Sequence, residues 1–134
     1  MKTNVQKLIG MAVLGLTLFS NSIPAWAGQK NSYQVVIKDF TNDSSAGGTT
    51  AGARYSSDTQ QYIGCNLLKS GSGPAVLCAA QDKTGKYLFC TGYSSKWAAV
   101  VKGITDFSYI VFTSAKGNGN CTNLEVHNSS VFLK

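Results

Sequence analysis

The chain has few of the residues on which catalysis and metal binding usually depend. His127 is its one histidine, so a Ser-His-acid triad would have to use that residue, and no Gly-x-Ser-x-Gly elbow accompanies it. No Cys-x-x-Cys pair and no closely spaced Cys/His set is present, which argues against a zinc site and against dithiol chemistry. We therefore expect no catalytic residue, no metal and no cofactor.

Charge is also scarce. Charged residues make up 13% of the chain and its formal net charge is +6, with the lysines and arginine dispersed rather than clustered. A nucleic-acid-binding surface usually needs a basic patch, so we expect no nucleic-acid partner. The remaining surface is rich in Ser, Thr, Asn and Gly, which is typical of exported β-rich proteins.

Long apolar runs are missing except near the start of the chain. Residues 8–19 are apolar, follow two lysines, and precede a polar segment that ends in Ala-Trp-Ala at residues 25–27. The run is shorter than the roughly 20 residues that span a bilayer, and the pattern is that of a cleavable signal peptide. We expect a signal peptide at 1–27 and one exported domain at 28–134, secreted or periplasmic, with no stable membrane anchor.

Four cysteines lie in the expected domain, and an even count in an oxidising compartment favours two disulfides. Strand alternation places Cys65, Cys78 and Cys90 on one face of a three-stranded antiparallel meander. Cys65 and Cys90 would then lie two strand spacings apart, roughly 10 Å, which is too far for a bridge. The pairing Cys65–Cys78 with Cys90–Cys121 is favoured over Cys65–Cys121 with Cys78–Cys90.

The rest of the chain reads as short strands separated by Gly, Pro and Asn turns. Residues 43–53 are almost all small and predict a mobile surface loop. A helix should begin at Ser94 or Ser95 and end at Gly103, because apolar residues recur there at helical spacing. The fold class is α+β or mainly β: a disulfide-stabilised antiparallel sheet of about six strands with one short helix. The expected strands are 32–40, 61–68, 75–81, 86–93, 109–113 and 121–127.

The face of the meander opposite the cysteines is unusually aromatic. It carries Tyr62, Leu77, Tyr87, Phe89 and Tyr93. One interpretation is that another layer covers this face, as most apolar sheet faces require. The other is that part of the row stays exposed as a platform for a sugar, a peptide or a lipid.

Residues 53–65 hold the densest mixture of charged, amide, hydroxyl and aromatic groups in the chain. Arg54 and Asp58 are four residues apart, so they can form a local salt bridge that braces the chain. Alternatively, the segment contributes to a recognition surface. The candidate binding residues are Arg54, Asp58, Gln61, Tyr62, Tyr87 and Tyr93.

The same segment carries a resemblance. Residues 53–65 read Ala-Arg-Tyr-Ser-Ser-Asp-Thr-Gln-Gln-Tyr-Ile-Gly-Cys, with Gly-Gly upstream and Cys78, Asp82 and Gly85 downstream. This pattern resembles an uncharacterised family of small exported bacterial proteins in which an Ala-Arg-x-Ser-x-Asp-x-x-Gln-Tyr-Ile-Gly-Cys block recurs. The resemblance implies a bacterial exported domain and transfers no functional site.

Taken together, the sequence favours a non-enzymatic binding or interaction module whose partner is an extracellular or periplasmic protein or glycan. Small size and disulfide-closed loops also fit an inhibitor of a secreted or periplasmic hydrolase. A further alternative is a small hydrolase that uses Asp58 or His127. For His127 we expect an exposed position on a strand beside Glu125, with Leu124 and Val126 facing inward.

Overall fold

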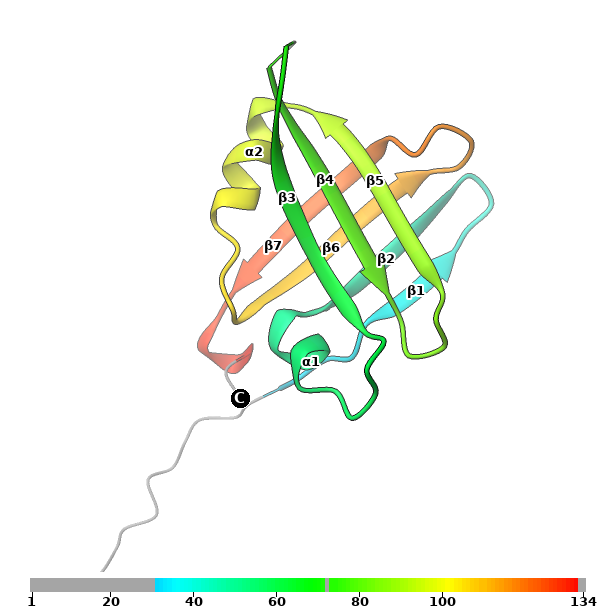
Figure 1. The fold of residues 1–134 in the computed structure, drawn as a ribbon, viewed down its shortest axis with the longest axis vertical. Helices are drawn as coiled ribbons and strands as arrows, with labels where there is room; N and C mark the ends of the chain where they lie inside the picture. Colours follow the sequence, from blue (N-terminus) through cyan, green and yellow to red (C-terminus); the bar gives the residue numbers. More distant parts are fainter. Residues whose placement is uncertain (1–30, 72, 133–134) are drawn as a thin grey trace, which may run out of the picture.

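The computed structural model describes residues 31–71 and 73–132, so the predicted signal peptide at 1–27 lies outside the described residues. The described chain forms seven strands in two antiparallel sheets, with two short helices and a final 3-10 turn (Figure 1). The expected antiparallel, disulfide-stabilised fold class is confirmed. The elements are β1 Val36–Asp39, β2 Asp43–Thr49, α1 Thr50–Arg54, β3 Tyr62–Ser70, β4 Gly73–Gln81, β5 Tyr87–Tyr93, α2 Ser95–Lys102, β6 Ser108–Ala115, β7 Cys121–Asn128 and η1 Ser130–Phe132.

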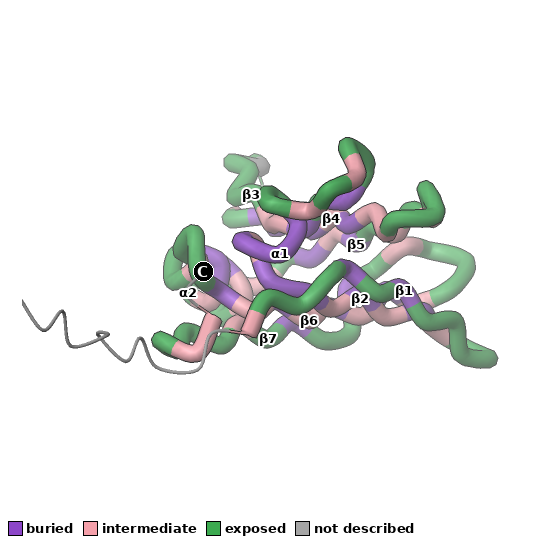
Figure 2. Tube along the Cα trace, turned by 90° about the horizontal axis from the view of Figure 1, so that it is seen from below, coloured by how far each residue is buried: buried purple, intermediate pink, exposed green. Residues whose placement is uncertain are grey.

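The two sheets lie face to face as layers. One has the strand order β1-β2-β6-β7 and the other is the predicted meander β3-β4-β5 (Figures 1 and 2). The meander register places Cys65 opposite Cys78, and Cys78 opposite Cys90. Four strands therefore lie at sheet edges: β1 and β7 in the first sheet, and β3 and β5 in the second.

The core fills the space between the layers. Alternate residues of β4 and β6 are fully buried there, among them Val76, Ala80, Ile110 and Phe112. Removing such a side chain from water contributes roughly 1.5–3 kcal/mol for a residue the size of Phe112. The alternation in both strands is the period of two that a half-buried strand requires.

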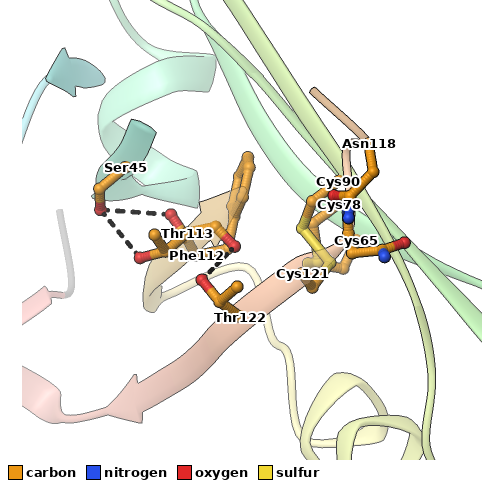
Figure 3. The surroundings of a disulfide bond; sticks show 10 residues. Ser45, Cys65, Cys78, Cys90, Phe112, Thr113, Asn118, Cys121 and Thr122 are labelled. Atoms are coloured by element: carbon orange, nitrogen blue, oxygen red, sulfur yellow. Dashed lines mark hydrogen bonds between the residues drawn. A yellow bond between two sulfur atoms is a disulfide. The ribbon is translucent and has the colours of Figure 1, made fainter. Parts of the chain in front are cut away.

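Two disulfides reinforce this core, and the favoured connectivity is confirmed. The Cys65–Cys78 bridge joins neighbouring strands β3 and β4, with Cα atoms 4.0 Å apart; we call it the intra-sheet disulfide. The Cys90–Cys121 bridge joins β5 to β7 and so links the two layers; we call it the inter-sheet disulfide. Figure 3 shows the four cysteines gathered at one place between the sheets.

The prediction of a mobile loop at 43–53 is wrong. These residues form β2, an inner strand of its sheet, and most of helix α1. Small residues are required because neighbours approach closely: a Cβ added to Gly48 would lie 3.0 Å from the Cα atom of Val35. Thr49 then begins α1, because its hydroxyl accepts a hydrogen bond from the backbone N–H of Gly52 at 2.9 Å. β2 is the seventh strand, which the expected six omitted.

The predicted helix is confirmed as α2, which begins after Ser94 and ends at Gly103. Val101 is buried, Trp97 packs against the core from the same helix, and Ile104 does so just beyond the helix end. A hairpin turn at 116–120 joins β6 to β7.

Candidate functional site

The outer side of the β3-β4-β5 sheet is open. Both helices and the other sheet lie on its inner side (Figure 2). Four aromatic side chains on the outer side are exposed: Tyr62 by 42%, Tyr87 by 51%, Phe89 by 46% and Tyr93 by 69%. The interpretation that another layer covers this side is therefore wrong for the described chain, and the exposed alternative holds. Whether a ligand uses it stays a prediction.

Strand register arranges this side in four rows across the sheet. The rows are Tyr62–Gln81–Tyr87, Gly64–Ala79–Phe89, Asn66–Leu77–Thr91 and Leu68–Ala75–Tyr93. We call these side chains the aromatic face, and none of them is charged. The Tyr87 ring lies 5.8 Å from the Phe89 ring and 6.3 Å from the Tyr62 ring, measured between centroids. The face therefore combines clustered rings with neutral amide and hydroxyl groups.

The Tyr62 phenol stays protonated over a wide pH range. Partial burial raises its pKa above the usual value of 10.0, and the neighbouring Tyr87 raises the pKa further. Neutral Tyr62 can donate one hydrogen bond and accept others from a polar ligand.

A hollow of about 480 Å³ lies beside strand β3. We call it the β3-edge pocket, and its lining comprises Thr50, Ala53, Arg54, Gln61, Tyr62, Ile63, Gly64, Cys65, Ile104, Thr105 and Asp106. Arg54 and Asp106 form an exposed ion pair there, with Nη2 3.2 Å from Oδ1. The predicted local salt bridge between Arg54 and Asp58 is wrong, because Arg54 turns to Asp106, which precedes β6.

Asp58 instead fastens its own loop. Its Oδ1 accepts hydrogen bonds from the backbone N–H groups of Gln60 and Gln61, at 3.0 and 2.9 Å. Its Oδ2 accepts a hydrogen bond from the side-chain amide Nε2 of Gln61. The Gln61 side chain is the main cause of the lowered pKa of Asp58, and its backbone N–H also contributes. Gln61 Oε1 in turn accepts the backbone N–H of Val35 at 2.7 Å. The pair thus ties the loop after α1 to the segment before β1.

The candidate binding residues therefore separate into groups. Arg54, Gln61 and Tyr62 meet at the β3-edge pocket. Tyr62 also belongs to the aromatic face, together with Tyr87 and Tyr93. Asp58 lines neither surface.

His127 lies where the sequence places it. It is exposed on β7, with Nε2 3.2 Å from Glu125 Oε2, while Leu124 is buried and Val126 is half-buried. Hydrogen bonds from Asn123 and His127 lower the pKa of Glu125. Within residues 31–71 and 73–132, no hydrogen bond joins the side chain of His127 or Asp58 to a serine, threonine or cysteine side chain.

Sequence reasoning missed several residues of these surfaces. Asn66, Leu68, Gln81 and Thr91 belong to the aromatic face, and strict alternation along each of the three strands would have found them. Asp106 had no such signal, because its contact with Arg54 depends on the tertiary fold. No described helix has the length and apolar character needed to cross a membrane.

Comparisons with known proteins add no assignment. No protein-family model, no curated protein and no solved structure matches the chain. The resemblance carried by residues 53–65 stays a prediction. The aromatic face and the β3-edge pocket are therefore the features that bear on function.

Proposed function

We propose that this protein is an exported, non-enzymatic binding module that holds a neutral carbohydrate chain against its aromatic face. The observation that carries the proposal is the exposure of four aromatic rings on one uncharged side of a sheet. Exposed apolar surface costs free energy in water, and a contiguous patch of it usually marks an interaction site.

The chemistry of the face favours a neutral sugar. A pyranose ring has C–H groups that pack on aromatic rings and a rim of hydroxyls that need hydrogen-bond partners. Asn66, Gln81 and Thr91 supply such partners between the rings. An ionic ligand would find no opposite charge on the face, and a purely apolar ligand would leave those polar groups unpaired.

A protein partner fits the face less well. Protein interfaces commonly combine aromatic residues with arginine and a polar, charged rim. The aromatic face has rings and neutral groups but no arginine, and the charged residue that lines a hollow beside Tyr87 and Phe89 is a lysine, Lys116, a residue type that protein interfaces disfavour.

Export is supported by two features. Residues 1–27 have the composition of a signal peptide, and both disulfides require an oxidising environment to persist. Polysaccharides are abundant partners in such compartments.

Affinity gel electrophoresis tests the proposal, with cellulose and chitin pull-downs for insoluble chains and alginate as an acidic control. Tyr87→Ala and Tyr93→Ala should each weaken retention about fivefold, because one lost ring contact is worth about 1 kcal/mol. Phe107→Ala is the matched control, since Phe107 is 39% exposed but lies off the face, before β6. It should bind like the wild type.

Gly64→Val tests the same face by adding a side chain to it, whereas the Tyr→Ala variants remove one. A Cβ at Gly64 meets no atom within 4 Å, so the substitution adds bulk to the face without disturbing the core. Retention should fall while the melting temperature does not. Retention that is equal in all variants, or that occurs only with alginate or with a protein partner, would contradict the carbohydrate assignment.

A further inference from the structure

We propose that two copies of this chain associate through strand β3, paired antiparallel and centred on Cys65, so that Leu67 of each copy enters the β3-edge pocket of the other. This inference goes beyond the proposed binding function and depends on different observations: an unprotected sheet edge, a self-complementary sequence and a pocket beside it.

Strand β3 is the unprotected edge of the described sheets. Natural edge strands are usually short, charged, bulged or covered, because their free N–H and C=O groups otherwise recruit another strand. β3 has nine residues in unbroken register with β4. The stretch 62–68 contains no charge and no proline.

The other three edges each carry a protective device. β1 has only four residues and includes Lys38 and Asp39. β5 is tied to β7 by the inter-sheet disulfide and by a hydrogen bond from Thr91 N–H to the Gly119 carbonyl at 2.8 Å. β7 presents the exposed Glu125, and its pairing with β6 is interrupted by a register shift.

The backbone groups of β3 that face the free edge can be identified. Directly opposite residues in an antiparallel pair lie about 4.5 Å apart when they exchange no hydrogen bonds and about 5.5 Å apart when they do. The Cα atoms of Cys65 and Cys78 are 4.0 Å apart, so Cys65 exchanges none with β4. Its N–H and C=O therefore point to the free edge, as do those of Ile63 and Leu67.

The sequence of β3 is self-complementary about Cys65. In an antiparallel pair of two copies centred there, Tyr62 lies opposite Leu68, Ile63 opposite Leu67, and Gly64 opposite Asn66 of the second copy. Large apolar side chains thus meet large apolar side chains on both sides of the joined sheet. The pairs of Ile63 with Leu67 and of Cys65 with itself exchange both N–H···O bonds.

Charge placement favours the same register. Lys69 faces neutral Gln61 of the second copy, and the two Lys69 residues lie roughly 27 Å apart at 3.4 Å per residue. Centring the pair on Asn66 instead would place Lys69 opposite Ile63. The register centred on Cys65 avoids that contact.

The pocket and the exposed leucines fit one another. Leu67 is 40% exposed and Leu68 is 48% exposed, although both lie on a strand. Opposite Ile63, Leu67 of the second copy meets the pocket wall formed by Ile63, Cys65 and Ile104. A side chain that is costly to expose in the monomer is then buried in the pair.

Sedimentation equilibrium over a concentration series tests the association with the purified protein. The wild type should reach twice the mass of the chain, and Leu67→Lys should halve it, because the lysine charge would enter the pocket beside Arg54. Val36→Lys is the matched control: it places the same charge at an exposed aliphatic residue of edge strand β1, and it should remain dimeric. Tyr87→Ala should also remain dimeric, which separates this proposal from carbohydrate binding.

A double variant, Tyr62→Cys with Leu68→Cys, tests the register. The two new thiols lie roughly 20 Å apart within one copy, six residues along the strand, but directly opposite one another between copies. A covalent dimer on a non-reducing gel is the expected result, with each single variant migrating as a monomer. A monomeric wild type at every concentration, a dimeric Leu67→Lys variant, or a dimer that the two thiols do not link would each overturn the proposal.

Discussion

Gly92 provides a sharp test of how the helix packs on the core. The residue faces inward on β5, and the six-membered ring of Trp97 from α2 lies so close that a Cβ at Gly92 would overlap it. Gly92→Ala must therefore displace Trp97 and with it the start of α2. Overpacking of this kind typically destabilises a protein by about 1–3 kcal/mol.

Gly64→Ala is the matched control for that measurement. Gly64 lies within β3 of the same sheet, and a Cβ there meets no atom within 4 Å. Both substitutions remove the backbone freedom of a strand glycine, which by itself stabilises by about 0.5–1 kcal/mol. The difference between the two variants therefore isolates the contact with Trp97 and should equal about 1–3 kcal/mol.

Thermal melting followed by circular dichroism measures this difference. For a domain of this size 1 kcal/mol corresponds to about 4–8 °C, so Gly92→Ala should melt at least about 4 °C below Gly64→Ala. Trp97→Leu in the Gly92→Ala background should recover part of the loss, with a coupling of about 0.5–3 kcal/mol. Equal melting temperatures, or strict additivity in the double-mutant cycle, would refute the packing described here.

Two further predictions concern the covalent and ionic links of the fold. The inter-sheet disulfide joins residues 31 apart in sequence and the intra-sheet disulfide residues 13 apart. The entropy that each bridge removes from the unfolded chain therefore stabilises the fold by about 3.7 and 2.9 kcal/mol, respectively. Urea unfolding of the two paired Cys→Ala variants should rank them in that order, and the reverse order would contradict the entropic argument. A hydrogen bond from the Lys86 ammonium is the main cause of the lowered pKa of Asp39, which lies below 3.8 in the folded protein, and the Ser44 hydroxyl also contributes. The ionised carboxylate therefore stabilises the fold above pH 3.8, and this contribution is lost as the pH falls through the folded pKa. Asp39→Asn should therefore show a shallower loss of stability below about pH 4 than the wild type in urea titrations, and identical slopes would exclude the effect.

The meander and the helix could be predicted because their determinants are local. Alternation along β3, β4 and β5 fixes which side chains share a face, and that alignment excluded a bridge between Cys65 and Cys90, although it left two connectivities open. β2 could not be recognised in the same way, because its small residues reflect the close approach of Val35 and of β6 from far along the chain. A run of glycine and alanine looks the same whether it is a loop or a tightly packed inner strand.

The sequence could predict which residues form the candidate site, but not whether their side chains are exposed. Tyr62, Tyr87 and Tyr93 follow from alternation, but their exposure depends on which side of the sheet the second layer covers. Arg54 shows the same limit: its nearest opposite charge in sequence is Asp58, whereas its partner in the fold is Asp106. The Asp58 carboxylate instead accepts three hydrogen bonds from N–H donors of its own loop.

Pairing of two copies through β3 would affect ligand binding, because it decides on which side of the joined sheet the two aromatic faces lie. Residues directly opposite in an antiparallel pair point to the same side of the sheet, so pairing Tyr62 with Leu68 of a second copy places both aromatic faces on one side. A carbohydrate chain long enough to cross strand β3 would then contact both faces at once. Its second contact is intramolecular and is governed by an effective concentration, so weak stacking on each face suffices for firm retention. Pairing of two copies through β3 would thus raise the affinity of a face whose individual contacts are modest.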